Sequence, residues 1–300
     1  MNRGRVPGLR SRDLLVGVAV TLVWGANFSV IGVGLQQVEP FLLTALRFTF
    51  AAFPFILFLP RPVGVPLWGL VLYGLVFGVG MWWSVSVALQ LGASPGVASL
   101  LLQFGAFFTI IGSAFLLGER IGWQQGLGMA LGALGLGALV VVSPGSKALA
   151  GLALVLLAAL AWACCNLMIK RWQPAHLLSF VVWTSAFAVP PLLLLGWALR
   201  GPALLQPLWQ GLSAMAWFSV LFQGWVTTVI CYMAWNTLIK RYPASSVAPL
   251  SLLVPISGLL TAWLVFDERL LSSQWLAVAL TLLGLGVFLL PARLIQCRGR

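Results

Sequence analysis

Two asparagines that lie deep in apolar stretches are the first residues whose chemistry stands out. Asn27 follows Trp24 by three positions and Asn166 follows Trp162 by four, so each pair shares one face of a helix. A carboxamide both donates and accepts hydrogen bonds, and apolar neighbours offer it few partners. The pattern predicts either two related amides that bind a small polar ligand or hydrogen bonds between helices.

A second group of polar and aromatic side chains recurs at helical spacing. Three pairs are four residues apart: Trp82 with Ser86, Tyr232 with Asn236, and Ser99 with Gln103. Gly78 lies one turn before Trp82, and Thr228 lies one turn before Tyr232. Each set of three residues is therefore expected on one face of its helix. These faces suit the walls of a ligand cavity, because each combines a ring with a hydrogen-bonding group. The alternative is ordinary packing, or an aromatic belt at the membrane interface.

Arg47 is the one ionisable residue that falls inside an expected membrane-spanning stretch. We expect its side chain either to extend toward the outer interface or to pair with Glu39 or a substrate carboxylate. No expected span carries a carboxylate in its middle, so a buried proton relay is not indicated.

Residue sets that carry enzymatic chemistry are missing from the sequence. The chain has a single histidine, His176, and no HExxH motif, nucleophile–base set or phosphate-binding GxxxxGK[ST] loop. Its four cysteines form no CxxC motif, and we expect Cys164, Cys165, Cys231 and Cys297 to be inert. The sequence therefore predicts a protein that is not an enzyme, holds no metal and uses no cofactor.

The composition identifies the setting in which these residues work. The 300-residue chain is 61% hydrophobic and 7% charged, whereas soluble domains are about 25% charged. A net charge of +12 would ordinarily suggest nucleic acid, but the basic residues lie at the ends of apolar stretches. That placement is typical of topology signals, so we expect a lipid bilayer as partner and no nucleic acid.

Charged residues and turns divide the chain into ten expected helical spans. No alternating ten-residue pattern indicates a β-barrel, so the expected fold class is an all-α membrane bundle. Most lysines and arginines then lie on the side of the N-terminus, which places both termini in the cytoplasm. The spans are expected at 14–36, 40–59, 66–90, 96–117, 123–143, 149–169, 176–198, 212–239, 243–266 and 273–292.

The sequence also contains an internal repeat. Gly118-Glu119-Arg120 recurs as Asp267-Glu268-Arg269, and Gln125 recurs as Gln274 at the same offset. Each half, 1–145 and 146–300, then holds five spans, and an odd number inverts the second half in the membrane. Inverted repeats are common in secondary transporters, which place the substrate near the membrane midplane between the halves.

Glycine, proline and tryptophan positions give further expectations. The glycine-rich stretches 123–143 and 273–292 predict two closely packed helices. Prolines predict a kink or interruption of their helices at Pro190-Pro191 and at Pro255. Tryptophans near the expected span ends predict interface anchors at Trp68, Trp123, Trp209 and Trp275.

The opening Trp24-Gly-Ala-Asn27, the Glu-Arg pairs after spans four and nine, and Pro255 carry a family resemblance. Together with the glycine-rich fifth and tenth spans, they resemble the drug/metabolite transporter superfamily, in its ten-helix EamA branch. The abundance of tryptophan is similar to the YddG type of amino-acid exporter. The resemblance implies an exporter in a bacterial inner membrane, with a cavity lined by spans one, three, four, six, eight and nine.

The expected function is export of amino acids, of apolar or aromatic type, and related small metabolites by alternating access down the substrate gradient. Amides and hydroxyls would hold the polar groups of the substrate, and rings would hold its side chain. The alternatives are export of drugs or other metabolites and, from another class, a passive channel or lipid scramblase.

Overall fold

The computed structural model describes residues 9–117, 121–142, 145–242 and 247–289, and within these ranges every regular element is helical. The α-helices are α1 (Ser11–Gly34), α2 (Pro40–Ala52), α3 (Leu67–Leu75), α4 (Ser84–Gln90), α5 (Pro95–Leu102), α6 (Phe104–Leu117), α7 (Trp123–Val142), α8 (Ser146–Trp172), α9 (Leu177–Arg200), α10 (Gln206–Gln210), α11 (Ala214–Leu221), α12 (Cys231–Arg241), α14 (Leu253–Phe266) and α15 (Ser272–Leu289). Shorter segments are π-helical in η2 (Val76–Trp83) and η4 (Phe222–Ile230), and 3₁₀-helical in η1 (Phe55–Leu57), η3 (Gly201–Leu205) and η5 (Ala248–Leu252).

Ten helical stretches in the described residues are long and apolar enough to cross a membrane. Their positions agree with the ten expected spans to within a few residues at most ends. The largest differences are the seventh stretch, which continues to Gln210, and the ninth, whose described part begins at Ala248. Many large apolar side chains of these helices are exposed, as expected for side chains that face lipid.

Local sequence signals explain where several helices begin. The Glu39 carboxylate accepts a hydrogen bond from the Leu42 backbone N–H at the start of α2, and Pro40 is the first helical residue. The Ser94 hydroxyl caps α5 in the same way, with Pro95 next to it. Both starts satisfy an otherwise unpaired backbone donor, and proline at the first position gives up no helical bond.

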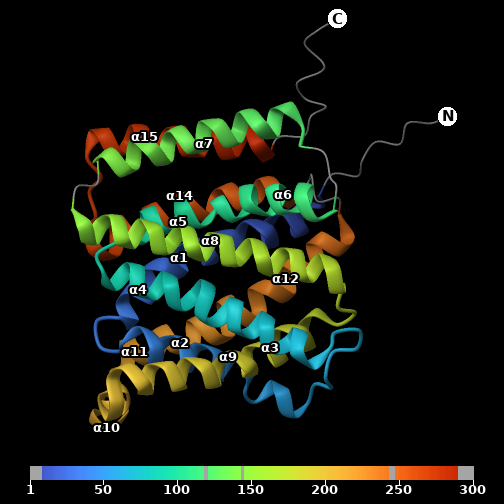
Figure 1. Ribbon diagram of the computed structural model, residues 1–300, viewed down its shortest axis with the longest axis vertical. Helices are drawn as coiled ribbons and strands as arrows, with labels where there is room; N and C mark the ends of the chain where they lie inside the picture. Colours follow the sequence, from blue (N-terminus) through green and yellow to red (C-terminus); the bar gives the residue numbers. More distant parts are fainter. Residues whose placement is uncertain (1–8, 118–120, 143–144, 243–246, 290–300) are drawn as a thin grey trace, which may run out of the picture.

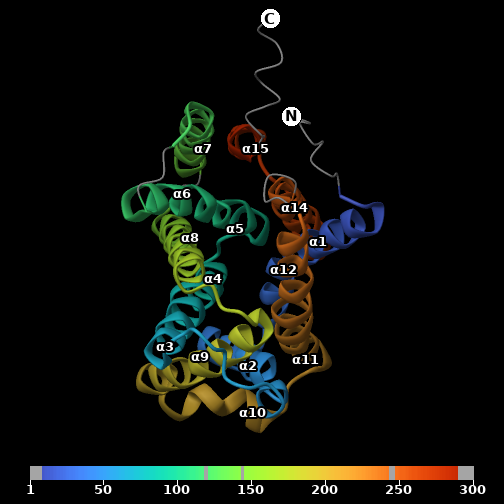
Figure 2. The same cartoon turned by 90° about the vertical axis from the view of Figure 1, so that its right-hand side faces the viewer.

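The helices form two sides that are joined at both ends (Figures 1 and 2). Figure 2 shows α3, α4, α6 and α8 on one side and α1, α11, α12 and α14 on the other. The pair α2 and α9 closes one end and the pair α7 and α15 the other. Each side thus combines the third span of one half of the chain with the first span of the other half.

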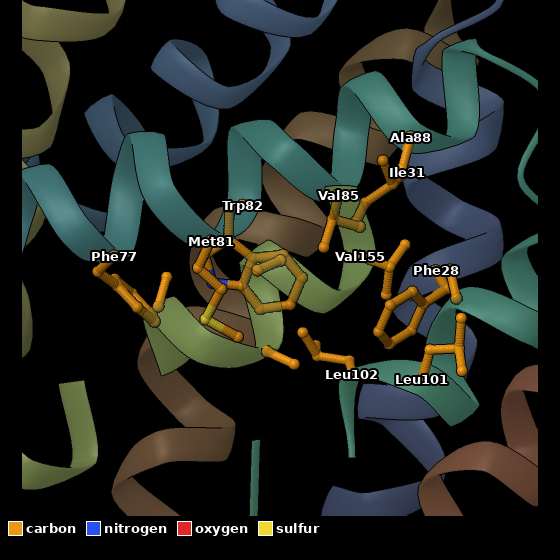
Figure 3. Packing of buried hydrophobic residues seen from close by; sticks show 14 of the residues in the cluster. Phe28, Ile31, Phe77, Met81, Trp82, Val85, Ala88, Leu101, Leu102 and Val155 are labelled. Carbon is orange, nitrogen blue, oxygen red and sulfur yellow. The ribbon is translucent and has the colours of Figure 1, made fainter. Parts of the chain in front are cut away.

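Apolar side chains from four spans fill the space between the two sides (Figure 3). Phe28 of α1 packs on Trp82 of η2, with 6.3 Å between the ring centroids. Leu101 and Leu102 of α5 and Val155 of α8 lie around this contact. The core of the molecule therefore lies where the two halves of the chain meet.

The glycine-rich spans pack closely, as the sequence predicts. A methyl group added at Gly284 of α15 would lie 2.5 Å from the Gly132 backbone nitrogen of α7, so the two backbones nearly touch. Trp123 and Trp275 at the starts of these helices are exposed, as are Trp68 and Trp209, which agrees with a position at the membrane interface.

The prolines that were expected to kink or interrupt their helices lie in two different settings. Helix α9 runs without interruption through Pro190 and Pro191 and packs along α2 and α3. Pro255 is the third residue of α14, where a missing N–H removes no helical bond. Helix α9 is therefore not interrupted at Pro190-Pro191, whereas span nine changes from η5 to α14 two residues before Pro255.

Candidate functional site

Arg47 lies two turns into α2, and its side chain is 1% exposed. Its Nε donates a hydrogen bond of 3.2 Å to the Thr228 Oγ1 in η4. Its guanidinium carbon lies 3.7 Å from the centre of a ring of Trp82 in η2, a cation–π contact. No described residue accepts a hydrogen bond from Nη1 or Nη2.

This burial corrects two of the expectations for Arg47. The side chain does not extend to the outer interface, because α2 places it on the face that packs against η4 and η2. It also does not pair with Glu39, whose Oε1 caps the start of α2 eight residues earlier. Eight helical residues separate the two positions by about 12 Å along the helix axis.

Asn27 is the second buried polar group without a described partner. Its side chain is 0% exposed, and neither Nδ2 nor Oδ1 has a hydrogen bond among the described residues. The next residue, Phe28, packs on Trp82, the ring that stacks on Arg47.

An aromatic cluster borders these groups on the side of α12. The Trp24 ring lies 5.2 Å from Tyr232 and 5.3 Å from Trp235, and Tyr232 lies 6.0 Å from Phe77 of η2. Trp24 Nε1 donates to the backbone oxygen of Thr227, the neighbour of the residue that contacts Arg47. Asn236 follows Tyr232 by one turn and is half-buried.

Trp82 and Ser86 both face α2. The Trp82 ring stacks on Arg47, and its Nε1 is buried without a described partner. The Ser86 hydroxyl lies 3.3 Å from that of Thr44 and donates to the Trp82 backbone oxygen. Gly78 packs against Ala188 of α9 instead, because the π-helical turn rotates it away from the face expected for regular spacing.

The remaining expected site residues contact neighbouring helices. Trp162 packs on Gly105 of α6, and Asn166 Nδ2 donates to the Thr109 hydroxyl of the same helix at 3.1 Å. Ser99 of α5 packs closely on Gly258 of α14. These contacts agree with the packing alternative, and they leave Asn166 and Asn27 in different surroundings.

The helices around the site are discontinuous at related positions in the two halves. The third span of each half contains a π-helical segment, η2 in the first and η4 in the second. The fourth spans also break: α5 ends at Leu102 and α6 begins at Phe104, while η5 gives way to α14 at Leu253. Buried Gln103 lies at the first break. Such discontinuities are typical of transporter binding sites.

This conformation closes the site to solvent, because Asn27 and Arg47 are almost fully buried. Two grooves on the surface lie elsewhere. One of about 310 Å³ has Glu39 and Arg200 among its lining residues, and one of about 500 Å³ runs along α14 and α15. No three of the described His, Cys, Asp and Glu side chains gather as a metal site would require.

The Glu-Arg repeat is described only in its second copy, since Glu119 and Arg120 lie outside the described residues. Glu268 accepts a hydrogen bond from the Ser94 hydroxyl, so the end of span nine is joined to the start of span four. Burial raises the pKa of Glu268 above its ordinary value, and the bonds from Ser94 and the Gly96 backbone oppose the rise. Arg269 pairs with Asp267 at 3.2 Å.

Ten helical spans with breaks around buried, unpaired polar groups define a multi-pass membrane transport protein. The EamA-like transporter family matches the chain twice, over residues 12–141 and 149–290. The chain belongs to this family. It is a transporter of the inner membrane, not an enzyme.

Relatives along nearly the whole chain support this assignment. A probable amino-acid metabolite efflux pump of Escherichia coli (strain K12) is 38% identical over 91% of this chain and 93% of its own length. A protein of the same description from Salmonella typhimurium is 37% identical over the same shares. A solved crystal structure has the same fold, with a TM-score of 0.62 over 97% of this chain and 100% of its own, at 21% identity.

Proposed function

We propose that this protein exports amino acids with apolar or aromatic side chains, and related small metabolites, by alternating access and down the substrate gradient. The buried Asn27 amide carries the proposal, because both of its hydrogen-bonding atoms are left for a ligand. The relative from Escherichia coli, described as a probable amino-acid metabolite efflux pump, supports the substrate class.

The proposed site lies between the two sides of the bundle. Asn27 and Asn236 would hold the polar groups of the substrate, and the rings of Trp24, Trp82 and Tyr232 would contact its side chain. Their half-buried or buried position beside broken spans suits a site that opens to one face at a time. The remaining proposed site residues are Ser86, Ser99, Gln103, Trp162 and Asn166.

Energy coupling and topology complete the proposal. The four described acidic side chains lie at helix ends or in loops: Asp13, Glu39, Asp267 and Glu268. A buried carboxylate relay for protons therefore has no support in the described spans, and transport proceeds without a coupled proton. Both termini lie in the cytoplasm, as the distribution of lysine and arginine indicates.

Uptake of a panel of labelled amino acids into liposomes that contain the purified protein tests this proposal. We expect saturable uptake of apolar or aromatic amino acids, unchanged by an imposed pH gradient. Proton flux that depends on the substrate would contradict the coupling. If saturable uptake is found for drugs and for no amino acid, the protein is an exporter of another substrate class. Flux without saturation would indicate a channel or scramblase.

A further inference from the structure

The guanidinium of Arg47 is a buried positive charge whose contacts are incomplete. Thr228 accepts from Nε, and Trp82 covers one face, but the N–H groups of Nη1 and Nη2 have no described acceptor. A charge within a membrane-spanning bundle is costly unless an opposite charge or several hydrogen bonds compensate it. Thr228 and Trp82 are both uncharged, so the compensation must have another source.

The described acidic residues do not supply that compensation. Asp13 accepts from the Tyr242 hydroxyl and lies 3.7 Å from Arg241. Glu39 caps α2. Asp267 and Glu268 follow α14 and contact Arg269 and Ser94 respectively. Each of these carboxylates lies near an end of a span and has a partner of its own.

The unpaired atoms around Arg47 match one kind of ligand. Nη1 and Nη2 form the planar fork that binds the two oxygens of a carboxylate. The buried Asn27 amide in α1 has an unpaired acceptor that suits an ammonium group, and an unpaired donor. The rings of Trp24 and Tyr232 border the same region and suit an apolar side chain.

We propose that Arg47 is the anchor for the carboxylate of the transported substrate and therefore selects metabolites that carry a carboxylate. This inference deepens the proposed function and rests on it for the wider substrate class. Thr228 and Trp82 hold the guanidinium so that Nη1 and Nη2 remain free for the ligand. Bound substrate neutralises the buried charge. The carrier with substrate bound therefore changes the membrane face to which its site opens more easily than the empty carrier does.

Binding of four related probes to the purified protein in lipid nanodiscs tests the anchor. Phenylalanine and 3-phenylpropionate carry a carboxylate, whereas phenylalaninamide and phenethylamine do not. We expect the two acids to bind the wild-type protein at least about tenfold more tightly than the two probes without a carboxylate, since a charge-assisted pair is lost. In Arg47→Gln this preference should disappear.

Two further variants make the result specific. Arg61→Gln removes an exposed arginine outside the spans and should keep the wild-type preference. Arg47→Lys keeps the charge but loses the fork, so it should bind the acids more weakly than wild type and decides the question if Arg47→Gln does not fold. The anchor would be overturned if wild type bound the acids and the amide equally, or bound neither acid. It would also be overturned if the preference for acids survived in Arg47→Gln or was undiminished in Arg47→Lys.

The outcomes separate the anchor from the proposed function. If 3-phenylpropionate binds through Arg47 while no amino acid is transported, the anchor stands and the amino-acid function fails. If amino acids are transported with saturation while Arg47→Gln keeps its preference for acids, the function stands and the anchor fails.

Discussion

At the scale of single residues, Asn27 and Asn166 have the same amide group and different contacts. Asn166 donates to Thr109 across to α6, whereas the buried Asn27 amide has no described partner. A buried polar group without a partner costs stability, so its retention suggests that it binds a ligand. The two asparagines should therefore respond differently to replacement.

We predict that Asn27→Ala lowers the transport rate of a saturably transported amino acid by about tenfold or more, since the substrate loses a charge-assisted hydrogen bond. Its thermal stability in detergent should stay near that of wild type, because no internal hydrogen bond is removed. Asn166→Ala should lower thermal stability by an amount equivalent to about 0.6 kcal/mol through the lost bond to Thr109. Transport that is unchanged in Asn27→Ala would contradict its role.

The sequence singled out Arg47 but left its position open. Its place in span two and the lack of acids in the expected spans were visible, yet the pattern was compatible with snorkelling, with pairing to Glu39 and with pairing to a substrate carboxylate. The direction of the side chain depends on how α2 is rotated against η2 and η4, and apolar spans carry little periodic signal that sets this rotation. For the same reason, the bond between Asn166 and Thr109 required the structure.

At the scale of elements, glycine spacing predicted the pairing of α7 and α15, and the structure shows how close it is. Gly284 lies against the backbone of Gly132, while Gly286 in the same helix has open space within 4 Å of an added methyl group. The breaks in spans three, four and eight were not predicted, because no proline or charge marks them. In span nine, η5 gives way to α14 two residues before Pro255, where the sequence predicts a kink or interruption.

We predict that Gly284→Ala lowers the thermal unfolding midpoint, since the added methyl group separates the two helices at a cost of about 1–3 kcal/mol. Gly286→Ala is the matched control, and it should unfold at or slightly above the wild-type temperature. Thermal unfolding of the three proteins in one detergent measures the effect. Equal midpoints for the two variants would contradict the close packing.

The burial of Glu268 predicts a pH effect on stability. Burial raises the folded-state pKa of Glu268 above 4.5, so the native protein binds more protons than the unfolded chain between the two pKa values. This stabilising contribution is present in full below the unfolded pKa and is lost as the pH rises through the folded pKa. Thermal stability of wild type relative to Glu268→Gln should therefore fall as the pH is raised from below 4.5 to neutral.

The titration of Glu39 does not affect this comparison. Its pKa is also raised by burial, but it is present in both proteins, and its contribution cancels. A wild-type stability that stays parallel to that of Glu268→Gln across the pH range would contradict the buried position of Glu268.

At the scale of the whole molecule, the ten spans of the described residues could be predicted, because long apolar stretches are a strong signal. The two related halves are a prediction from recurring sequence segments. The structure adds how the halves combine: the first span of each half packs beside the third span of the other. The family match to residues 12–141 and 149–290 agrees with a chain built from two related parts. Their inverted orientation in the membrane remains our proposal.

A buried charge that substrate neutralises has a consequence for the transport cycle. When the empty carrier changes the membrane face to which its site opens, the Arg47 guanidinium is uncompensated. In the loaded carrier the substrate carboxylate compensates it. Exchange of one substrate molecule for another should therefore be faster than net efflux.

Counterflow tests the central claim, that this protein is an alternating-access carrier of amino acids, most directly. Liposomes containing the protein are loaded with unlabelled phenylalanine and diluted into a trace of labelled phenylalanine, and the label inside is followed over time. We predict transient accumulation of label above its equilibrium level, at a rate that saturates with substrate and exceeds net efflux. Entry of label that only approaches equilibrium, at the same rate with or without internal phenylalanine, would contradict the account.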